Sequence, residues 1–197
     1  NDLVSIAGRS WRACRAFMAL AALGALLRPA ALTAGFVDRT AVLAPGLNDG
    51  NASWGDFDRD GYPDLNVDGL IWRNQGGTNF IQRAGYGSGP WGDVNNDGYL
   101  DLFRYHRPCR IWLYNPAAET FVLADTPDVA TPKSPSAACW ADFQGDGFID
   151  LYVCGYETDA DYWPDCILSN RTDGTMSMVW QQTGDIDPAR GATACDF

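Results

Sequence analysis

The sequence predicts an all-β protein, a β-propeller with four-stranded blades, and three observations support this prediction. One loop pattern recurs three times along the chain. Short runs of β-branched and aromatic residues bounded by Gly, Pro, Asn and Asp follow each loop, which is typical of strands and turns. No amphipathic stretch longer than two helical turns follows residue 35. Four-stranded sheets arranged radially leave only short, protected edges.

The recurring pattern begins with Trp-Gly or Trp-Ala and ends with Asp-Leu. Its three copies occupy residues 54–65, 91–102 and 140–151. The first acidic residues of successive copies are 37 and 49 residues apart. Asp196, 54 residues further on, has the position of the first acidic residue of a fourth copy. A repeat of this length is typical of a propeller, solenoid or array.

Each copy places oxygen-bearing residues at alternate positions around a glycine. A hard cation such as Ca²⁺ takes six to eight oxygens at about 2.3–2.6 Å, and the glycine permits the sharp turn that lets alternate residues converge. We therefore predict three calcium ions, one per complete copy. The predicted ligands, with carbonyls at Tyr62, Tyr99 and Phe148, are Asp56, Asp58, Asp60, Tyr62 and Asp64; Asp93, Asn95, Asp97, Tyr99 and Asp101; and Asp142, Gln144, Asp146, Phe148 and Asp150. Asp196 is a possible fourth site.

Two other interpretations of the loops explain fewer of their residues. Asp-Gly pairs alone are favoured hairpin turns, but this leaves the three further oxygen-bearing residues of each copy unexplained. An EF-hand loop closes with Glu at its twelfth position, where this chain has Val67, Arg104 and Val153. Gln144 is longer than the Asp or Asn expected at its position, so we expect the third site to be weaker.

The ligand pattern, with its flanking Trp-Gly and Asp-Leu, resembles the FG-GAP/VCBS repeats. These repeats form the β-propeller head of integrin α subunits and also occur in secreted proteins of the cartilage acidic protein type. The resemblance covers residues 36–197 and implies a calcium-binding propeller. It also implies that residues 36–40 form a strand leading into a repeat, either closing the ring or standing as an edge strand. Since propellers have about four to eight blades, three repeats and the start of a fourth indicate a fragment.

The N-terminal region has the features of a secretory signal. Basic residues at 9, 12 and 15 precede an apolar run over residues 16–27, and small residues follow at 30–35. The run is too short for a membrane span of about 20 apolar residues; a short buried helix is the alternative. The predicted organisation is a signal over 1–34 and a partial propeller over 35–197, with repeats near 48–85, 86–135 and 136–190 and a truncated one from 191.

Net charge favours cations and disfavours nucleic acid as partners. The chain carries a formal charge of −11. Without residues 1–34, which hold four Arg and one Asp, 10 basic and 24 acidic residues remain, a charge of −14. Nucleic-acid binding requires a basic face, whereas this charge suits a protein that binds divalent cations.

Cysteines and one acidic, aromatic insertion provide the remaining candidate features. An exported protein is expected to oxidise most of its cysteines, so we predict disulfides between Cys154 and Cys166 and between Cys109 and Cys139. The insertion over residues 155–165 is a candidate for ligand contact through Tyr156, Tyr162 and Trp163; a solvated hairpin tip is the alternative.

We predict an exported binding or adhesion module at the cell surface or outside the cell, with an extracellular protein or carbohydrate as its ligand and structural calcium. No catalytic motif is recognisable, and His106 is the only histidine. The alternatives are a calcium-dependent, lyase-like enzyme acting on polysaccharides, with its catalytic residues mostly elsewhere, and a passive matrix component.

Overall fold

The computed structural model describes residues 37–48, 50–129, 135, 137–155, 163–183 and 191–194. The expected signal segment, Tyr156, Tyr162 and Asp196 lie outside these residues. The chain divides into two compact units, residues 1–38 and 39–197. Apart from residues 37 and 38, everything that follows concerns the second unit.

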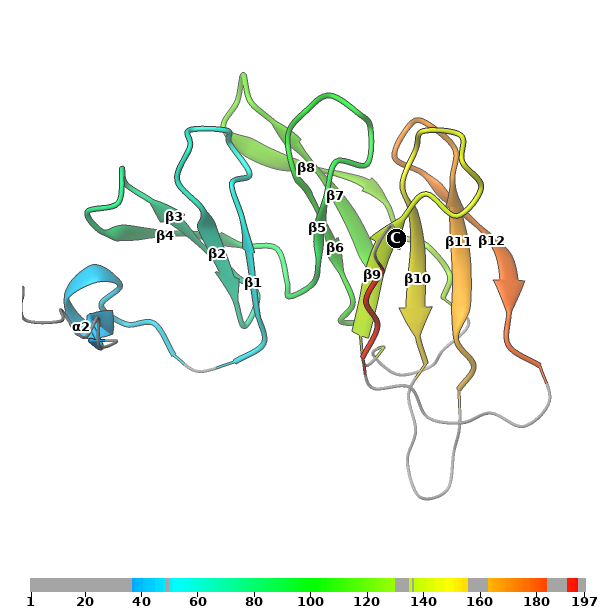
Figure 1. Cartoon of the computed structure of the whole chain (residues 1–197), viewed down its shortest axis with the longest axis horizontal. Helices are drawn as coiled ribbons and strands as arrows, with labels where there is room; N and C mark the ends of the chain where they lie inside the picture. Colours follow the sequence, from blue (N-terminus) through cyan, green and yellow to red (C-terminus); the bar gives the residue numbers. More distant parts are fainter. Residues whose placement is uncertain are drawn as a thin grey trace, which may run out of the picture. The chain divides into compact units, whose positions relative to one another are not determined.

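Twelve described strands form three four-stranded antiparallel sheets, each a meander of sequential neighbours (Figure 1). The first contains β1 (Ala52–Gly55), β2 (Asp64–Val67), β3 (Leu70–Asn74) and β4 (Phe80–Gly85). The second contains β5 (Trp91–Gly92), β6 (Asp101–Arg104), β7 (Arg110–Asn115) and β8 (Thr120–Asp125). The third contains β9 (Ala137–Ala141), β10 (Asp150–Cys154), β11 (Cys166–Asn170) and β12 (Met176–Gln181). The all-β prediction, with one four-stranded sheet per repeat, is confirmed.

The segment before the first sheet differs from the prediction. A strand was expected over residues 36–40, but residues 37–39 have no regular structure and Thr40–Leu43 forms the one-turn helix α2. After α2, Ala44 is buried and Leu47 partly buried against Trp72 and other apolar residues of the first sheet. The segment thus covers a sheet face by side-chain packing, without adding a strand.

Apolar side chains join each sheet to the next. Phe57 and Ile71 from the first sheet pack with Leu102, Tyr114 and Phe121 from the second. A larger cluster joins the second and third sheets; it includes Val94, Phe103, Ile111, Leu151 and Leu168. The inner strands β2 and β6 are therefore almost wholly buried, and their polar residues Asp64, Asn66 and Asp101 are buried together with the apolar ones.

A tryptophan and a glycine interlock the sheets at each junction. The indole Nε1 of Trp91 donates to the Ser53 carbonyl, and that of Trp140 to the Pro90 carbonyl, both at 3.3 Å. A Cβ placed on Gly55 would lie 2.9 Å from Trp91, and one on Gly92 would lie 2.8 Å from Trp140. Only glycine leaves room for the indole at these two positions. The same contact is thus made twice, one repeat apart.

The four described cysteines are free thiols, so neither expected disulfide is present in the structure. Register explains the first case: Cys166 lies opposite Val153, and neighbouring residues of a strand point to opposite faces. Cys154 therefore points away from the face that carries Cys166. Cys109 is buried in the cluster that contains Cys166, whereas Cys139 is half-buried on β9.

Candidate metal centres

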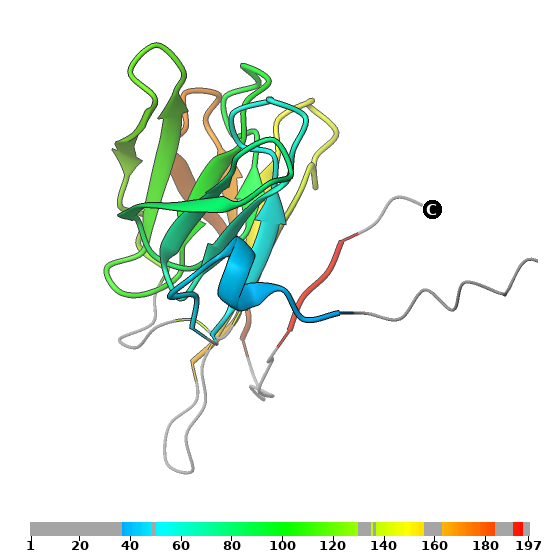
Figure 2. The same cartoon turned by 90° about the vertical axis from the view of Figure 1, so that its left-hand side faces the viewer.

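The three candidate metal loops connect the first two strands of each sheet, over residues 56–63, 93–100 and 142–149. Both views show them at the same end of their sheets (Figures 1 and 2). The loops therefore occupy equivalent places in three equivalent sheets, and their internal geometry can be compared residue by residue.

The first aspartate of each loop accepts the same two backbone hydrogen bonds, and Asp142 accepts a third from the Gly145 N–H at 2.7 Å. Its Oδ1 accepts from the N–H of the fifth residue and its Oδ2 from that of the sixth. For Asp56 the two distances are 3.0 and 3.0 Å, for Asp93 3.0 and 2.9 Å, and for Asp142 3.1 and 2.8 Å. For Asp142 these hydrogen bonds hold the pKa of the carboxyl below its usual value. Each carboxylate thus stabilises a tight turn of the backbone that follows it.

The fifth residue of each loop, an aspartate, continues the turn. Its Oδ1 accepts the N–H of the seventh residue at 2.9 Å in all three loops. Two left-handed residues make this curvature possible. The sixth is always Gly, with φ of 89°, 89° and 88°, and the fourth is Arg59, Asn96 or Gly145, with φ of 60°, 55° and 72°. The conformation therefore persists even where the fourth residue is not glycine.

The last aspartate of each loop is buried and fastens the loop to the third strand of its sheet. Asp64, Asp101 and Asp150 are at most 1% exposed. Each accepts one hydrogen bond from the loop's second residue and one from the third strand. The donors are the amides of Phe57 and Asn74 at 3.2 and 2.7 Å, of Val94 and Tyr114 at 2.9 and 2.8 Å, and of Phe143 and Asn170 at 3.0 and 3.0 Å. Burial raises the pKa of Asp64 and of Asp101 to about 7.

The donor set of these loops fits a hard divalent cation. In the first loop, carboxylate oxygens of Asp56, Asp58 and Asp64 lie within 4.8 Å of one another. Both oxygens of Asp58 are buried and form no hydrogen bond; the partner that the structure gives this carboxylate is the ion pair with Arg73. Histidine and cysteine are absent from all three loops, and a set composed only of oxygens is the one that calcium prefers.

The third residue differs between the loops. Asn95 donates its amide to Asp97 Oδ2 at 2.9 Å, within its own loop. Gln144 donates to Asp146 Oδ2 at 3.1 Å and also to Ser169 Oγ on β11 at 2.8 Å. The longer Gln144 arm is thus partly engaged by the neighbouring strand, in keeping with the expectation of a weaker third site.

Three features of the loops were missed by sequence reasoning. Arg73 on β3 forms an ion pair with Asp58 of the first loop. Arg59 lies over the ring of Tyr99, 5.6 Å from its centroid, and Asn96 donates to the Gly147 carbonyl at 2.8 Å. The last two contacts join successive loops. They depend on how one repeat packs on the next, and the spacing of residues within a repeat does not predict that packing.

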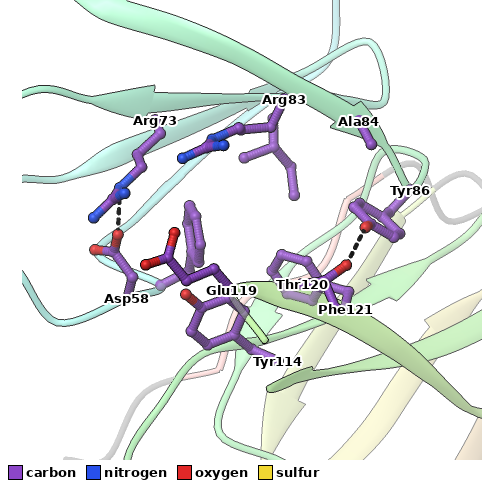
Figure 3. A pocket seen from close by; sticks show the side chains of 11 residues that line it. Asp58, Arg73, Arg83, Ala84, Tyr86, Tyr114, Glu119, Thr120 and Phe121 are labelled. Carbon is purple, nitrogen blue, oxygen red and sulfur yellow. Dashed lines mark hydrogen bonds and ion pairs between the residues drawn. The ribbon is translucent and has the colours of Figure 1, made fainter. Parts of the chain in front are cut away.

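A cavity of about 170 Å³ lies beside the first loop, between β3–β4 and the hairpin of β7 and β8 (Figure 3). Asp58, Arg73 and Arg83 lie toward one end, with Glu119 and Tyr114 nearby. At the other end the Tyr86 hydroxyl and Thr120 Oγ1 form a hydrogen bond of 3.0 Å. The cavity therefore combines charged groups with an aromatic wall.

The insertion in the third sheet is described only at its base. Trp163 is half-buried there. Asp165 accepts hydrogen bonds from the Gly155 amide at 2.7 Å and from the Tyr152 hydroxyl, and this fastens the two ends of the insertion together. A role in ligand contact stays a prediction.

Comparison with known families agrees with the repeat structure. The family model of the FG-GAP-like repeat matches residues 93–153, from the first aspartate of the second loop to β10. The predicted resemblance is confirmed over these residues. Neither the curated proteins nor the solved structures contain a significant match to the chain. No helix in the described part of the chain is long and apolar enough to cross a membrane.

Proposed function

We propose that this chain is a calcium-binding repeat module of the β-propeller type, and that its calcium ions are structural. The observation that carries the proposal is the repetition of one hydrogen-bond scheme. In each loop, five equivalent bonds orient the first, fifth and ninth residues. Ordinary Asp-Gly turns do not require three aspartates held in the same way in three loops.

The proposed ligands are those that the sequence predicts. They are Asp56, Asp58, Asp60, Asp64 and the Tyr62 carbonyl; Asp93, Asn95, Asp97, Asp101 and the Tyr99 carbonyl; and Asp142, Gln144, Asp146, Asp150 and the Phe148 carbonyl. Calcium would supply positive charge to groups of carboxylates that otherwise repel one another. Since the ninth residue is fastened to the third strand, the ligands join the loop to the sheet, and metal binding would add to folding stability.

Exposed aromatic residues at both ends of the array support a larger propeller. Trp91 and Trp140 lie against a preceding sheet, but Trp54 is 62% exposed. Phe57 and Val94, the second residues of their loops, are buried by the following sheet, but Phe143 is 47% exposed. We propose that repeats of the same kind cover both surfaces. Trp54 would make the Trp–Gly contact seen at the two existing junctions, whereas the third sheet has Ala141 in place of Gly55 and Gly92 and would meet a further repeat through a different contact.

A binding or adhesion role outside the cell is the activity that we propose for this module. It is supported by the FG-GAP-like match and by the strongly acidic composition. Apart from Asp58, which forms an ion pair with Arg73, the loop carboxylates are engaged in hydrogen bonds that shape the loops, which favours a structural role for them over an acid–base role in catalysis.

Calorimetric counting of calcium sites tests the proposal. We expect about three ions per chain, and about two for Asp97→Ala, which removes an oxygen ligand from the second loop alone. Asp173→Ala is the control, because Asp173 lies in an exposed turn outside the loops and its loss should leave three ions. Three ions in Asp97→Ala would contradict the assignment of the second loop.

A further inference from the structure

The first loop carries one carboxylate more than the other two. Its third residue is Asp58, where the second and third loops have the neutral Asn95 and Gln144. The Asp58 side chain is only 6% exposed, and its oxygens have no hydrogen-bond donor. A buried carboxylate without a partner is costly, so the first loop requires a compensating charge that the other loops do not.

Arg73 provides that charge from β3. Its Nε lies 2.5 Å from Asp58 Oδ2, and its Nη2 lies 3.6 Å from Asp60 Oδ2. The guanidinium thus reaches two of the proposed ligands from outside the loop. Figure 3 shows the ion pair of Arg73 and Asp58 at the edge of the cavity.

The other two loops have no such residue at the equivalent strand position. Trp72 pairs with Leu65, Trp112 with Leu102 and Leu168 with Leu151, so the residues that follow them, Arg73, Leu113 and Ser169, are equivalent. Leu113 packs against the core, and Ser169 accepts a hydrogen bond from Gln144. Counting only the proposed ligand side chains together with Arg73, all three sites have the same formal charge of −3.

We propose that Arg73 is a built-in counter-cation of the first loop. The counter-cation itself is inferred from the ion pair of Arg73 and Asp58. Its effect on calcium affinity rests on the proposed function. Arg73 keeps Asp58 and Asp60 in place when metal is absent. Because Arg73 and calcium compete for the same carboxylates, the first loop binds calcium more weakly than the second, whose Asn95 has its partner within the loop.

The cavity gives Arg73 somewhere to move when it leaves Asp58. Arg73 lines the cavity together with Phe57, Tyr114 and Phe121. A guanidinium is well accommodated over aromatic rings, where the ring quadrupole attracts it. Exchange of partners at Asp58 therefore requires a new side-chain conformation and no rearrangement of the sheet.

The test compares Arg73→Leu with Arg83→Leu by calcium calorimetry and by thermal unfolding in chelator. Leucine is the residue at the equivalent position of the second repeat. Arg83 lines the same cavity but forms no ion pair with a loop among the described residues. We expect Arg73→Leu to raise the calcium affinity of the first loop at least about tenfold, which is about 1.4 kcal/mol, and Arg83→Leu to leave all sites unchanged.

In chelator, Arg73→Leu should unfold at a lower temperature than Arg83→Leu, and saturating calcium should restore it. Arg73→Lys, which keeps the charge, should bind calcium as the unmodified chain does. If Arg73→Leu does not fold, Arg73→Gln replaces it in both measurements. Unchanged affinities for the leucine or glutamine variant would overturn the inference. If no variant binds calcium, the proposed function fails separately, and equal unfolding temperatures in chelator would then reject the counter-cation.

Discussion

At the scale of single residues, the fourth position of each loop links one loop to the next. This residue is left-handed in all three loops, which turns its side chain out of its own loop. Arg59 reaches Tyr99, and Asn96 reaches Gly147. Gly147 directly precedes Phe148, whose carbonyl is a proposed ligand. Since Gly145 has no side chain, the third loop cannot make this contact.

The Asn96 contact predicts coupling between the second and third sites. Asn96→Gly removes the amide without straining a left-handed residue. Loss of one hydrogen bond costs about 0.5–1.5 kcal/mol, so the third site should bind calcium roughly 2- to 10-fold more weakly. The second loop keeps its own hydrogen bonds and should retain its affinity. Calorimetric titration checks this, and a loss confined to the second site would be the contrary result.

At the scale of elements, sheet-to-sheet contact depends on the absence of a side chain. A Cβ on Gly92 would lie 2.7 Å from Ile149 Cδ1 and 2.8 Å from Trp140 Cδ1. Both atoms belong to the next repeat, and Ile149 is the eighth residue of its loop. The glycine before each of the first two loops therefore sets how closely the following sheet can approach.

Gly92→Ala should consequently destabilise the junction of the second and third sheets. Overpacking of a filled contact costs about 1–3 kcal/mol, and denaturant unfolding would measure it. The matched control is Gly191→Ala, because no atom of the described residues lies within 4 Å of a Cβ at that position. Equal stability of the two variants would mean that the Trp–Gly contact is not a close-packed junction.

The sequence predicted the elements well where a residue pattern repeats. It predicted poorly those features that depend on strand register or on packing between segments. The three Asp–Gly patterns and the strand runs after them correctly located three sheets of four strands. The Cys154–Cys166 pairing was not found, because an offset of one residue across β10 and β11 turns the two side chains to opposite faces. The expected strand before the first sheet became α2 and a packing segment around Ala44. Neither outcome has a signal in local composition.

Of the candidate site, the sequence supplied the proposed ligands but not what holds them. Backbone amides of Asn74, Tyr114 and Asn170 fasten the last aspartates from strands 10, 13 and 20 residues away. These separations vary with the length of the intervening segments, so no fixed spacing in the sequence identifies the donor residues. Arg73 was missed because its role does not repeat. The equivalent residues of the other two repeats are Leu113 and Ser169, so the position shows no shared pattern.

At the scale of the whole molecule, a rise in pH should lower the stability of the metal-free fold, and calcium should raise it. The pKa of Asp64 and of Asp101 is raised by burial from 3.8 to about 7. At a pH between 3.8 and about 7, the folded chain therefore binds more protons at these two carboxyls than the unfolded chain does. The stability contributed by these groups is fully present below about pH 4 and is lost as pH rises through about 7. Calcium would replace those protons and release them on binding.

Thermal unfolding at pH 5 and pH 7.5, each in excess calcium and in chelator, tests the central claim that the three loops bind calcium. In chelator, the contribution of Asp64 and Asp101 should make the chain unfold at a lower temperature at pH 7.5 than at pH 5. Calcium should raise the unfolding temperature at pH 7.5 strongly, since saturation at about 100 times the dissociation constant adds roughly 2.7 kcal/mol per independent site. The increase should be smaller at pH 5, where protons compete. An unfolding temperature unaffected by calcium at pH 7.5 would contradict the account.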